Sequence, residues 1–269
     1  MQNFLRLWDT PASLPFRFTM KHYHVFSSGV VKTRFKEEKL DSPESWDMLR
    51  TTDPLFTIAD TRDEWIEVST QAVRKDGQDV HLAKRAREIA EILWAKNIST
   101  VFSTGSGGAG LEYLLYSVFP ELKILCSEYA PATVSALKKV FLEAEDIILF
   151  DIKESNWNVV TERMDAKNTL CLMYRLDAQF TDNEWKEIFT RLAGAGVVQV
   201  LFIPTGFLTM KGLLSRLRSR ITWFLKRRPM VFSGYLRTKE TMHTYWERNF
   251  QSTEYVVGGM TSFWLTLKK

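Results

Sequence analysis

Cysteines and long apolar runs are scarce in this chain, and each scarcity excludes a class of protein. The 269 residues contain two cysteines, Cys126 and Cys171, which is too few for the disulfide framework of a small secreted domain. No apolar run is long enough to span a bilayer, and the first residues lack the apolar core of a signal peptide. We therefore expect a cytoplasmic protein whose two thiols are buried and free.

Metal-ligand patterns are also missing. The four histidines and two cysteines form no cluster with zinc spacing. His22 and His24 flank Tyr23 and would share one face of a strand. Because no third ligand lies near them in the sequence, we interpret them as surface or hydrogen-bonded histidines and predict no metal site.

The composition is sufficient for one large domain with an appendage, because 45% of the 269 residues are apolar. Residues 1–80 are punctuated by prolines and carry scattered aromatic residues, so we predict an irregular N-terminal extension that packs as a cap. The main domain is predicted to be 81–269. The net charge of +4 conceals a basic segment, since residues 205–240 hold nine Lys and Arg residues and one Glu.

The stretch from Thr100 to Leu115 contains a short apolar run, then a group of glycines, then apolar residues at helical spacing. A strand, a glycine loop and a helix in this order let the backbone approach a ligand beside the unpaired N–H groups of the helix. Glu128 follows the next apolar run, so its carboxylate would lie at the tip of the second strand and could accept both hydroxyls of a ribose. These features predict a nucleotide-binding site.

Strands and helices alternate from residue 99 onward, which predicts parallel strands joined by right-handed crossovers. Strands are predicted at 99–103, 122–127, 146–150, 169–174 and 197–203, and helices at 82–94, 109–118, 131–143, 156–165 and 182–193. Two β-rich runs, Thr253–Val257 and Ser262–Leu267, are joined through Gly258-Gly259 and predict an antiparallel hairpin. The predicted fold class is therefore α/β, with a seven-stranded, mostly parallel sheet, helices on both faces and a C-terminal antiparallel hairpin.

Five parallel strands finished by an antiparallel pair resemble the class I S-adenosylmethionine-dependent methyltransferases, and the resemblance covers about residues 80–269. Gly105, Gly107 and Gly110 resemble the first motif of that family. Glu128, in ILCSEYAP, resembles the acid that holds the ribose. The resemblance implies S-adenosylmethionine as the cofactor, bound by Gly105, Ser106, Gly107, Gly110, Glu128, Tyr129, Asp151, Ile152 and Tyr174.

Two positions depart from the family pattern. Ser103 stands where an acid is usual, two residues before the first motif glycine, and Ala109 stands where a further glycine is common. A catalytically silent Rossmann-like binding module is therefore one alternative function. The spacing Gly105-x-Gly107-x-x-Gly110 also fits the dinucleotide fingerprint, so an NAD(P)-dependent oxidoreductase is another. The long segment before the first strand and the closing hairpin favour the methyl donor.

Asp177 and His243 are the candidates for a catalytic base, since both lie in segments expected at the carboxyl edge of the sheet. The place of the Asn/Asp-Pro-Pro-Tyr motif of amino methyltransferases reads Tyr174-Arg175-Leu176-Asp177. This difference favours O-methylation of a small-molecule, glycan or lipid-linked acceptor, with residues 1–80 on the acceptor side.

A basic helical insertion is predicted at 209–229. Its apolar stripe consists of Leu213, Leu214, Leu217, Ile221, Phe224 and Leu225. Its charges are Arg216, Arg218, Arg220, Lys226, Arg227 and Arg228. A basic amphipathic helix indicates binding to an anionic membrane surface, through 211–229, or to a lipid-linked acceptor. The alternative is a core-packed helix with a solvated basic face, and nucleic acid is a less favoured partner because only Trp223 interleaves the arginines.

Overall fold

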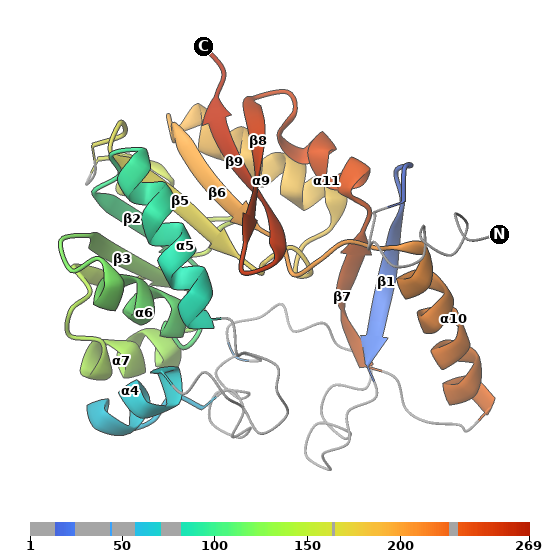
Figure 1. The fold of residues 1–269 in the computed structure, drawn as a ribbon, viewed down its shortest axis with the longest axis horizontal. Helices are drawn as coiled ribbons and strands as arrows, with labels where there is room; N and C mark the ends of the chain where they lie inside the picture. The colour runs from blue at the N-terminus through green and yellow to red at the C-terminus, as the bar shows by residue number, and fades with distance from the viewer. Residues whose placement is uncertain (1–13, 25–43, 45–56, 71–81, 163–164, 226–230) are drawn as a thin grey trace.

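The computed structural model describes residues 14–24, 44, 57–70, 82–162, 165–225 and 231–269. A seven-stranded sheet in the order β4-β3-β2-β5-β6-β9-β8 lies beside a two-stranded sheet, β1-β7 (Figure 1). The strands of the large sheet are β2 Thr100–Thr104, β3 Lys123–Glu128, β4 Asp146–Leu149, β5 Thr169–Tyr174, β6 Gln199–Ile203, β8 Phe250–Val257 and β9 Met260–Leu267. The small sheet pairs β1 Thr19–His24 with β7 Val231–Arg237.

The strand directions confirm the predicted fold class. Strands β2 to β6 are parallel, whereas β9 runs antiparallel to both β6 and β8. The helices are α4 Arg62–Thr70, α5 Leu82–Ala95, α6 Gly110–Val118, α7 Pro131–Val140, α8 Asn158–Thr161, α9 Asp182–Gly194, α10 Met210–Leu225 and α11 Lys239–Trp246. Two helices are shorter than predicted: α7 ends at Val140, and among the residues of 156–165 that the structure describes only Asn158–Thr161 is helical.

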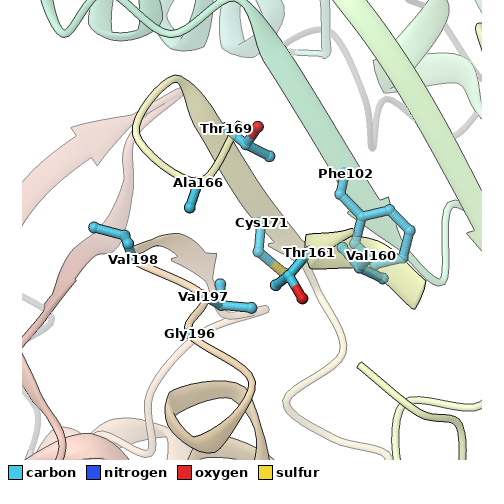
Figure 2. A pocket seen from close by; sticks show the side chains of 9 residues that line it. All are labelled: Phe102, Val160, Thr161, Ala166, Thr169, Cys171, Gly196, Val197 and Val198. Carbon is cyan, nitrogen blue, oxygen red and sulfur yellow. The ribbon is translucent and has the colours of Figure 1, made fainter. Parts of the chain in front are cut away.

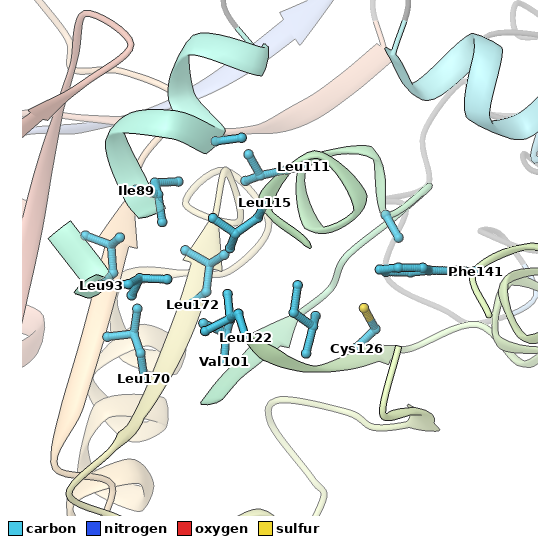
Figure 3. Packing of buried hydrophobic residues seen from close by; sticks show 14 of the residues in the cluster. Ile89, Leu93, Val101, Leu111, Leu115, Leu122, Cys126, Phe141, Leu170 and Leu172 are labelled. Atoms are coloured by element: carbon cyan, nitrogen blue, oxygen red, sulfur yellow. The ribbon is translucent and has the colours of Figure 1, made fainter. Parts of the chain in front are cut away.

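Helices cover both faces of the large sheet, with α5, α6 and α7 on one face and α9 and α11 on the other (Figure 1). Successive residues of a strand point to opposite faces, so Val101 packs in the first core cluster and Phe102 in the second. Leu115 of α6 and Leu172 of β5 interdigitate in the first cluster (Figure 3). Cys126 and Cys171 are buried and free, as predicted.

Part of the predicted extension belongs to the core. Trp65 of α4 is buried and packs edge-to-face against Tyr113 and at a tilt against Phe141, with ring centroids 5.0 and 5.3 Å away. Arg62, in the first turn of α4, forms an ion pair with Glu143. Helix α4 was not predicted, because its nine residues show only a weak apolar stripe, and Trp65 is the one buried residue among those whose burial is described.

The small sheet joins distant parts of the chain. Phe18 donates its backbone N–H to Thr241 Oγ1 at 2.8 Å, and Thr238 returns a backbone hydrogen bond to Phe18. Strand β7 and helix α11 follow the basic segment and were not predicted. Several predicted features lie outside the described residues. These are most of residues 1–80, the charges Lys226, Arg227 and Arg228, and the side chains of His24, Trp223, Phe224 and Leu225.

Candidate functional site

The carboxyl ends of β2, β3, β4, β5 and β6 meet at one edge of the large sheet (Figure 1). Strand β2 lies between β3 and β5, so the chain leaves β2 toward one side and leaves β5 toward the other. Open α/β sheets bind ligands in the crevice at this kind of switch point. The glycine loop, residues 105–109, starts at this position.

The backbone of the glycine loop is in the left-handed region at three positions: Gly105 (φ 61°), Gly107 (φ 62°) and Ala109 (φ 54°). A Cβ at Gly105 would also lie 2.8 Å from Leu176 Cδ2, so a side chain at that position would require Leu176 to shift. Ala109 has the left-handed backbone that a glycine would adopt without strain, and its Cβ makes this conformation less favourable by about 1 kcal/mol. Its methyl group is buried in the first core cluster, which offsets part of that cost.

Glu128 closes the glycine loop onto the second strand. Its Oε1 accepts a hydrogen bond from the backbone N–H of Gly107 at 2.5 Å, and its Oε2 accepts one from Tyr129 N–H at 3.0 Å. Ser106 adds a backbone bond to Ser127 O at 3.1 Å. A carboxylate oxygen has more than one lone pair, so Glu128 can still accept the hydroxyls of a ribose. The structure thus brings Glu128 to the glycine loop.

Asp151 lies beside Glu128, because Phe150 N–H donates to Glu128 O at 2.9 Å. The Asp151 carboxylate accepts the backbone N–H of Lys153 at 2.8 Å, which holds it at the turn after β4. The side chain of Ile152 packs in the second core cluster instead. A contact between Ile152 and a ligand would therefore come from its backbone.

The end of β5 forms the other side of the crevice. The Tyr174 hydroxyl accepts a hydrogen bond from Arg85 Nη1 of α5 at 2.8 Å. Arg175 is a second non-glycine residue of this edge in the left-handed region, with φ 58°, and its guanidinium lies 6.0 Å from the centre of the Tyr174 ring. Left-handed backbone at non-glycine residues is often found at functional sites.

Asp177 and Arg237 hold the loop that follows β5. The Asp177 carboxylate is buried and accepts hydrogen bonds from Thr205 N (2.6 Å) and Thr205 Oγ1 (2.8 Å). Burial raises the pKa of Asp177, and the two bonds from Thr205 oppose that rise. Arg237, fully buried, donates to Asp177 O and Phe180 O, and its Nε lies 2.6 Å from Asp182 Oδ1.

Asp182, at the start of α9, receives three side-chain hydrogen bonds. Arg237 Nε and Tyr245 Oη donate to Oδ1, at 2.6 and 2.7 Å, and Thr19 Oγ1 donates to Oδ2 at 2.8 Å. Burial alone would raise the pKa of Asp182, but these bonds and the charge of Arg237 outweigh it and lower the pKa. Strand β1, strand β7 and helix α11 are thereby attached to one carboxylate.

His243 lies on α11 against Trp246 and Phe263, with ring centroids 5.4 and 5.1 Å away. Burial lowers its pKa, as does the nearby charge of Lys239. His243 is thus on the α9 and α11 face of the sheet, whereas Asp177 is in the loop after β5. Within the described part of the chain no hydrogen bond joins the two candidate bases.

Residues outside the predicted set also support the glycine loop. Trp65 Nε1 donates to Gly108 O at 2.9 Å, which links α4 to the loop. Ser103 Oγ donates to Glu112 Oε1 at 2.5 Å, although neither residue is in the predicted set of cofactor-binding residues. Burial raises the pKa of Glu112 to about 7, with the bond from Ser103 opposing and the charge of Glu128 adding to the rise. In the sequence, the one indication for Glu112 is its position as the third residue of α6. This position becomes informative only when Ser103 is known to lie opposite it.

Two pockets lie at the amino ends of the strands, away from this edge. One is apolar and is lined by Cys171, Val197 and seven other residues around the starts of β5 and β6 (Figure 2). The other is polar and includes Thr100 and Lys123, the first residues of β2 and β3. Because ligands of open α/β sheets bind at the carboxyl ends, we assign neither pocket to the site. Among the described residues no group of three His, Cys, Asp or Glu residues could hold a metal ion, and no helix is both long and apolar enough to cross a bilayer.

Comparison with known proteins supports the fold. No family model and no curated protein matches the sequence. The structure is similar to human N-acetylserotonin methyltransferase in complex with S-adenosylmethionine, with 15% identity and a TM-score of 0.50 over 89% of this chain and 65% of that one. It is also similar to mitomycin 7-O-methyltransferase, with 14% identity and a TM-score of 0.52 over 83% of this chain and 60% of that one. The chain thus spans less than two thirds of either protein, and it has the class I S-adenosylmethionine-dependent methyltransferase fold.

Proposed function

We propose that this protein is an S-adenosylmethionine-dependent methyltransferase that methylates an oxygen atom of a small-molecule, glycan or lipid-linked acceptor. The observation that carries the proposal is the Glu128 carboxylate hydrogen-bonded to Gly107 at the switch point of the sheet. The similar solved structures support it, because one is named as an O-methyltransferase and another as a complex with the methyl donor.

The residues present fit this donor. Gly105 has no side chain, and a Cβ there would clash with Leu176 unless Leu176 moved. The loop backbone is therefore not covered by a side chain where a ligand would approach. Glu128 would accept the ribose hydroxyls, and Asp151 and Tyr129, at the next strand ends, would flank the adenine. Gly110 begins α6, whose first N–H groups carry partial positive charge. Tyr174 would border the donor from β5.

When bound, the donor supplies a methyl group on a sulfonium, and transfer to an acceptor oxygen is an in-line displacement. The chain would contribute mainly by aligning the acceptor with the methyl group. Alignment alone can lower the activation barrier by about 7–11 kcal/mol at best. The loop after β5, anchored by the hydrogen bonds of Asp177 and Arg237, would position an acceptor opposite the methyl group. Contacts of Asp177 with Thr205, and of His243 with aromatic rings, support positioning roles for both candidate bases.

The predicted division into a cap, 1–80, and a main domain, 81–269, also enters the proposal. The bond from Trp65 to Gly108 O supports a location of the first segment beside the donor loop. The pairing of β1 with β7 and the bond from Thr19 to Asp182 support a location of another part of it beside the start of α9, next to the loop after β5. We propose that this segment borders the acceptor.

Calorimetry with S-adenosylmethionine and its demethylated product tests the donor site. The wild type should bind both, and Glu128→Ala should weaken binding by about 1–3 kcal/mol, the scale for leaving hydroxyls unpaired. Glu121→Ala is the matched control, since Glu121 is exposed near the other end of β3. Binding of NADH without the sulfonium would establish the oxidoreductase alternative, and donor binding without turnover on any acceptor class would establish the silent module.

We further propose that α10 binds an anionic membrane surface. Met210, Leu214, Leu217 and Ile221 recur on one face of α10, and their side chains are 44–62% exposed. Leu213 instead packs toward Leu208, so this part of the predicted stripe faces the protein. The exposed Lys211 and Arg218 supply charge beside the exposed stripe, a combination that favours an anionic interface.

Vesicle flotation tests this surface. The protein should float with anionic vesicles at low salt and be released at high salt, since surface attraction of about 1 kcal/mol per charge is screened. Lys211→Gln with Arg218→Gln should reduce flotation. Lys139→Gln with Lys186→Gln, on α7 and α9, removes the same charge elsewhere and should not. Equal flotation of both double variants would contradict a role for α10.

A further inference from the structure

The departure at Ser103 has a structural counterpart in Glu112. Ser103 is 1% exposed at the end of β2, and its hydroxyl donates to Glu112 Oε1 at 2.5 Å. Glu112 is the third residue of α6, and its side chain is directed back to the strand from which the glycine loop departs. A carboxyl group therefore lies beside position 103 although the residue there is a serine.

This carboxyl group is placed where burial is costly. Glu112 is 2% exposed, and the described residues form no ion pair with it. A buried carboxylate without a cation is strongly disfavoured. Its retention on α6, whose Leu111 and Leu115 belong to the first core cluster, needs an explanation that packing alone does not supply.

The methyl donor carries an ammonium group at the end of its amino-acid tail. With the ribose at Glu128, the tail would extend along the glycine loop toward the start of α6. Resting on the proposed function, we propose that the Glu112 carboxylate, hydrogen-bonded by Ser103, binds the ammonium group of the methyl donor. The acid expected on β2 is thereby supplied by α6.

The charged groups on the elements packed against α6 are consistent with an anionic site at Glu112 that has no cationic partner until the donor binds. Arg85 of α5 donates to the Tyr174 hydroxyl, and Arg62 of α4 pairs with Glu143. On β3, Glu128 adds negative charge, and burial raises the pKa of the Cys126 thiol, which keeps it neutral. An incoming ammonium would therefore meet two carboxyl groups and no competing cation from these elements.

Proton linkage follows from this arrangement. The unliganded pKa of Glu112 is about 7, and an ammonium partner would lower it. Donor binding should then release a proton near neutral pH. Affinity should be about tenfold weaker at pH 6 than at pH 8, because each unit below the free pKa costs a factor of about ten.

The experiment is calorimetry of the full chain with S-adenosylhomocysteine and with methylthioadenosine, which lacks the amino-acid tail, at pH 6 and pH 8. Glu112→Gln keeps the bond to Ser103 but removes the charge. It should weaken S-adenosylhomocysteine binding at pH 8 by about tenfold or more and abolish the pH dependence. Methylthioadenosine binding should not change. Ser103→Asp in the Glu112→Gln background should restore the affinity and the pH dependence, because the carboxyl group returns to β2.

The outcomes separate this inference from the proposed function. If the wild type binds neither ligand, the methyltransferase proposal fails. If the wild type binds S-adenosylhomocysteine and Glu112→Gln binds it equally well with the same pH dependence, only the role of Glu112 is overturned. An equal loss of affinity for methylthioadenosine would also overturn it, since the effect would then not concern the ammonium group.

Discussion

The two halves of the carboxyl edge are built differently. The half proposed to bind the methyl donor, here called the donor half, is formed around β2, β3 and α6. It consists of backbone N–H groups and two carboxyl groups, Glu112 and Glu128, in contacts between neighbouring elements. The half proposed to border the acceptor, here called the acceptor half, follows β5 and β6 and is held by one buried guanidinium, Arg237, which reaches it from β7. The donor half therefore depends on local backbone geometry, and the other half depends on a long-range ionic contact.

The largest expected effect comes from removing the guanidinium. Arg237→Ala should destabilise the protein by about 3–5 kcal/mol, because Asp182 would lose its cation and the carbonyls of Asp177 and Phe180 would lose their donor. Chemical denaturation measures this change. Arg248→Ala, at an exposed position after α11, is the control and should alter stability by less than about 0.5 kcal/mol. Similar values for the two variants would show that Arg237 does not hold the acceptor half.

A substitution in the donor half, Glu112→Gln, should increase stability rather than decrease it. Folding raises the pKa of Glu112 from 4.5 to about 7, so the folded state is favoured when this group is protonated, and that advantage is lost as pH rises through 7. Glu112→Gln stays neutral and should stabilise the unliganded protein at pH 8 by about 1–3 kcal/mol. The gain should shrink toward pH 5.

Denaturation of Glu112→Gln at the two pH values measures the difference, with the exposed Glu121→Gln as control. A variant that is more stable but binds the donor less tightly would show that the donor half sacrifices stability for binding. A loss of stability at pH 8 would instead indicate that Glu112 serves the fold.

A smaller effect should distinguish two glycines of the same loop. Gly105→Ala places a methyl group 2.8 Å from Leu176 Cδ2 at φ 61°, so it should cost about 1–2 kcal/mol and weaken donor binding. Gly108→Ala meets nothing within 4 Å and its φ is not positive, so it should be nearly neutral. Thermal melts with and without S-adenosylhomocysteine compare the two, and equal effects would contradict the backbone account of the loop.

Most of the large sheet could be predicted from the sequence because its signals are local. Apolar runs of strand length alternate with helical patterns, and each of the predicted strands is present within two or three residues of its expected ends. The position of Glu128 beside Gly107 followed from the same regularity, since the ends of adjacent parallel strands must meet at one edge.

The acceptor half could not be predicted, because its contacts join residues far apart in the chain. Phe18 and Thr241, which connect the β1 region to α11, are 223 residues apart, and Arg237 lies 55 residues from Asp182. Strand β7 was not recognised in the sequence because it directly follows a basic segment. Its partner, β1, lies near the other end of the sequence. No periodicity within either segment indicates such a pairing.

The sequence by itself determined the order of strands and helices, the glycine loop and the acid at the tip of β3, because hydrophobic period and turn chemistry act over a few residues. Only the tertiary structure decided where the chain places the second carboxyl group of the donor half, Glu112. Ser103 indicates a missing acid, and folding of α6 onto β2 brings Glu112 to the serine hydroxyl. A side chain's position in space depends on how its helix packs, and that packing is fixed by the buried surface of the whole domain rather than by the residues next to it in the chain.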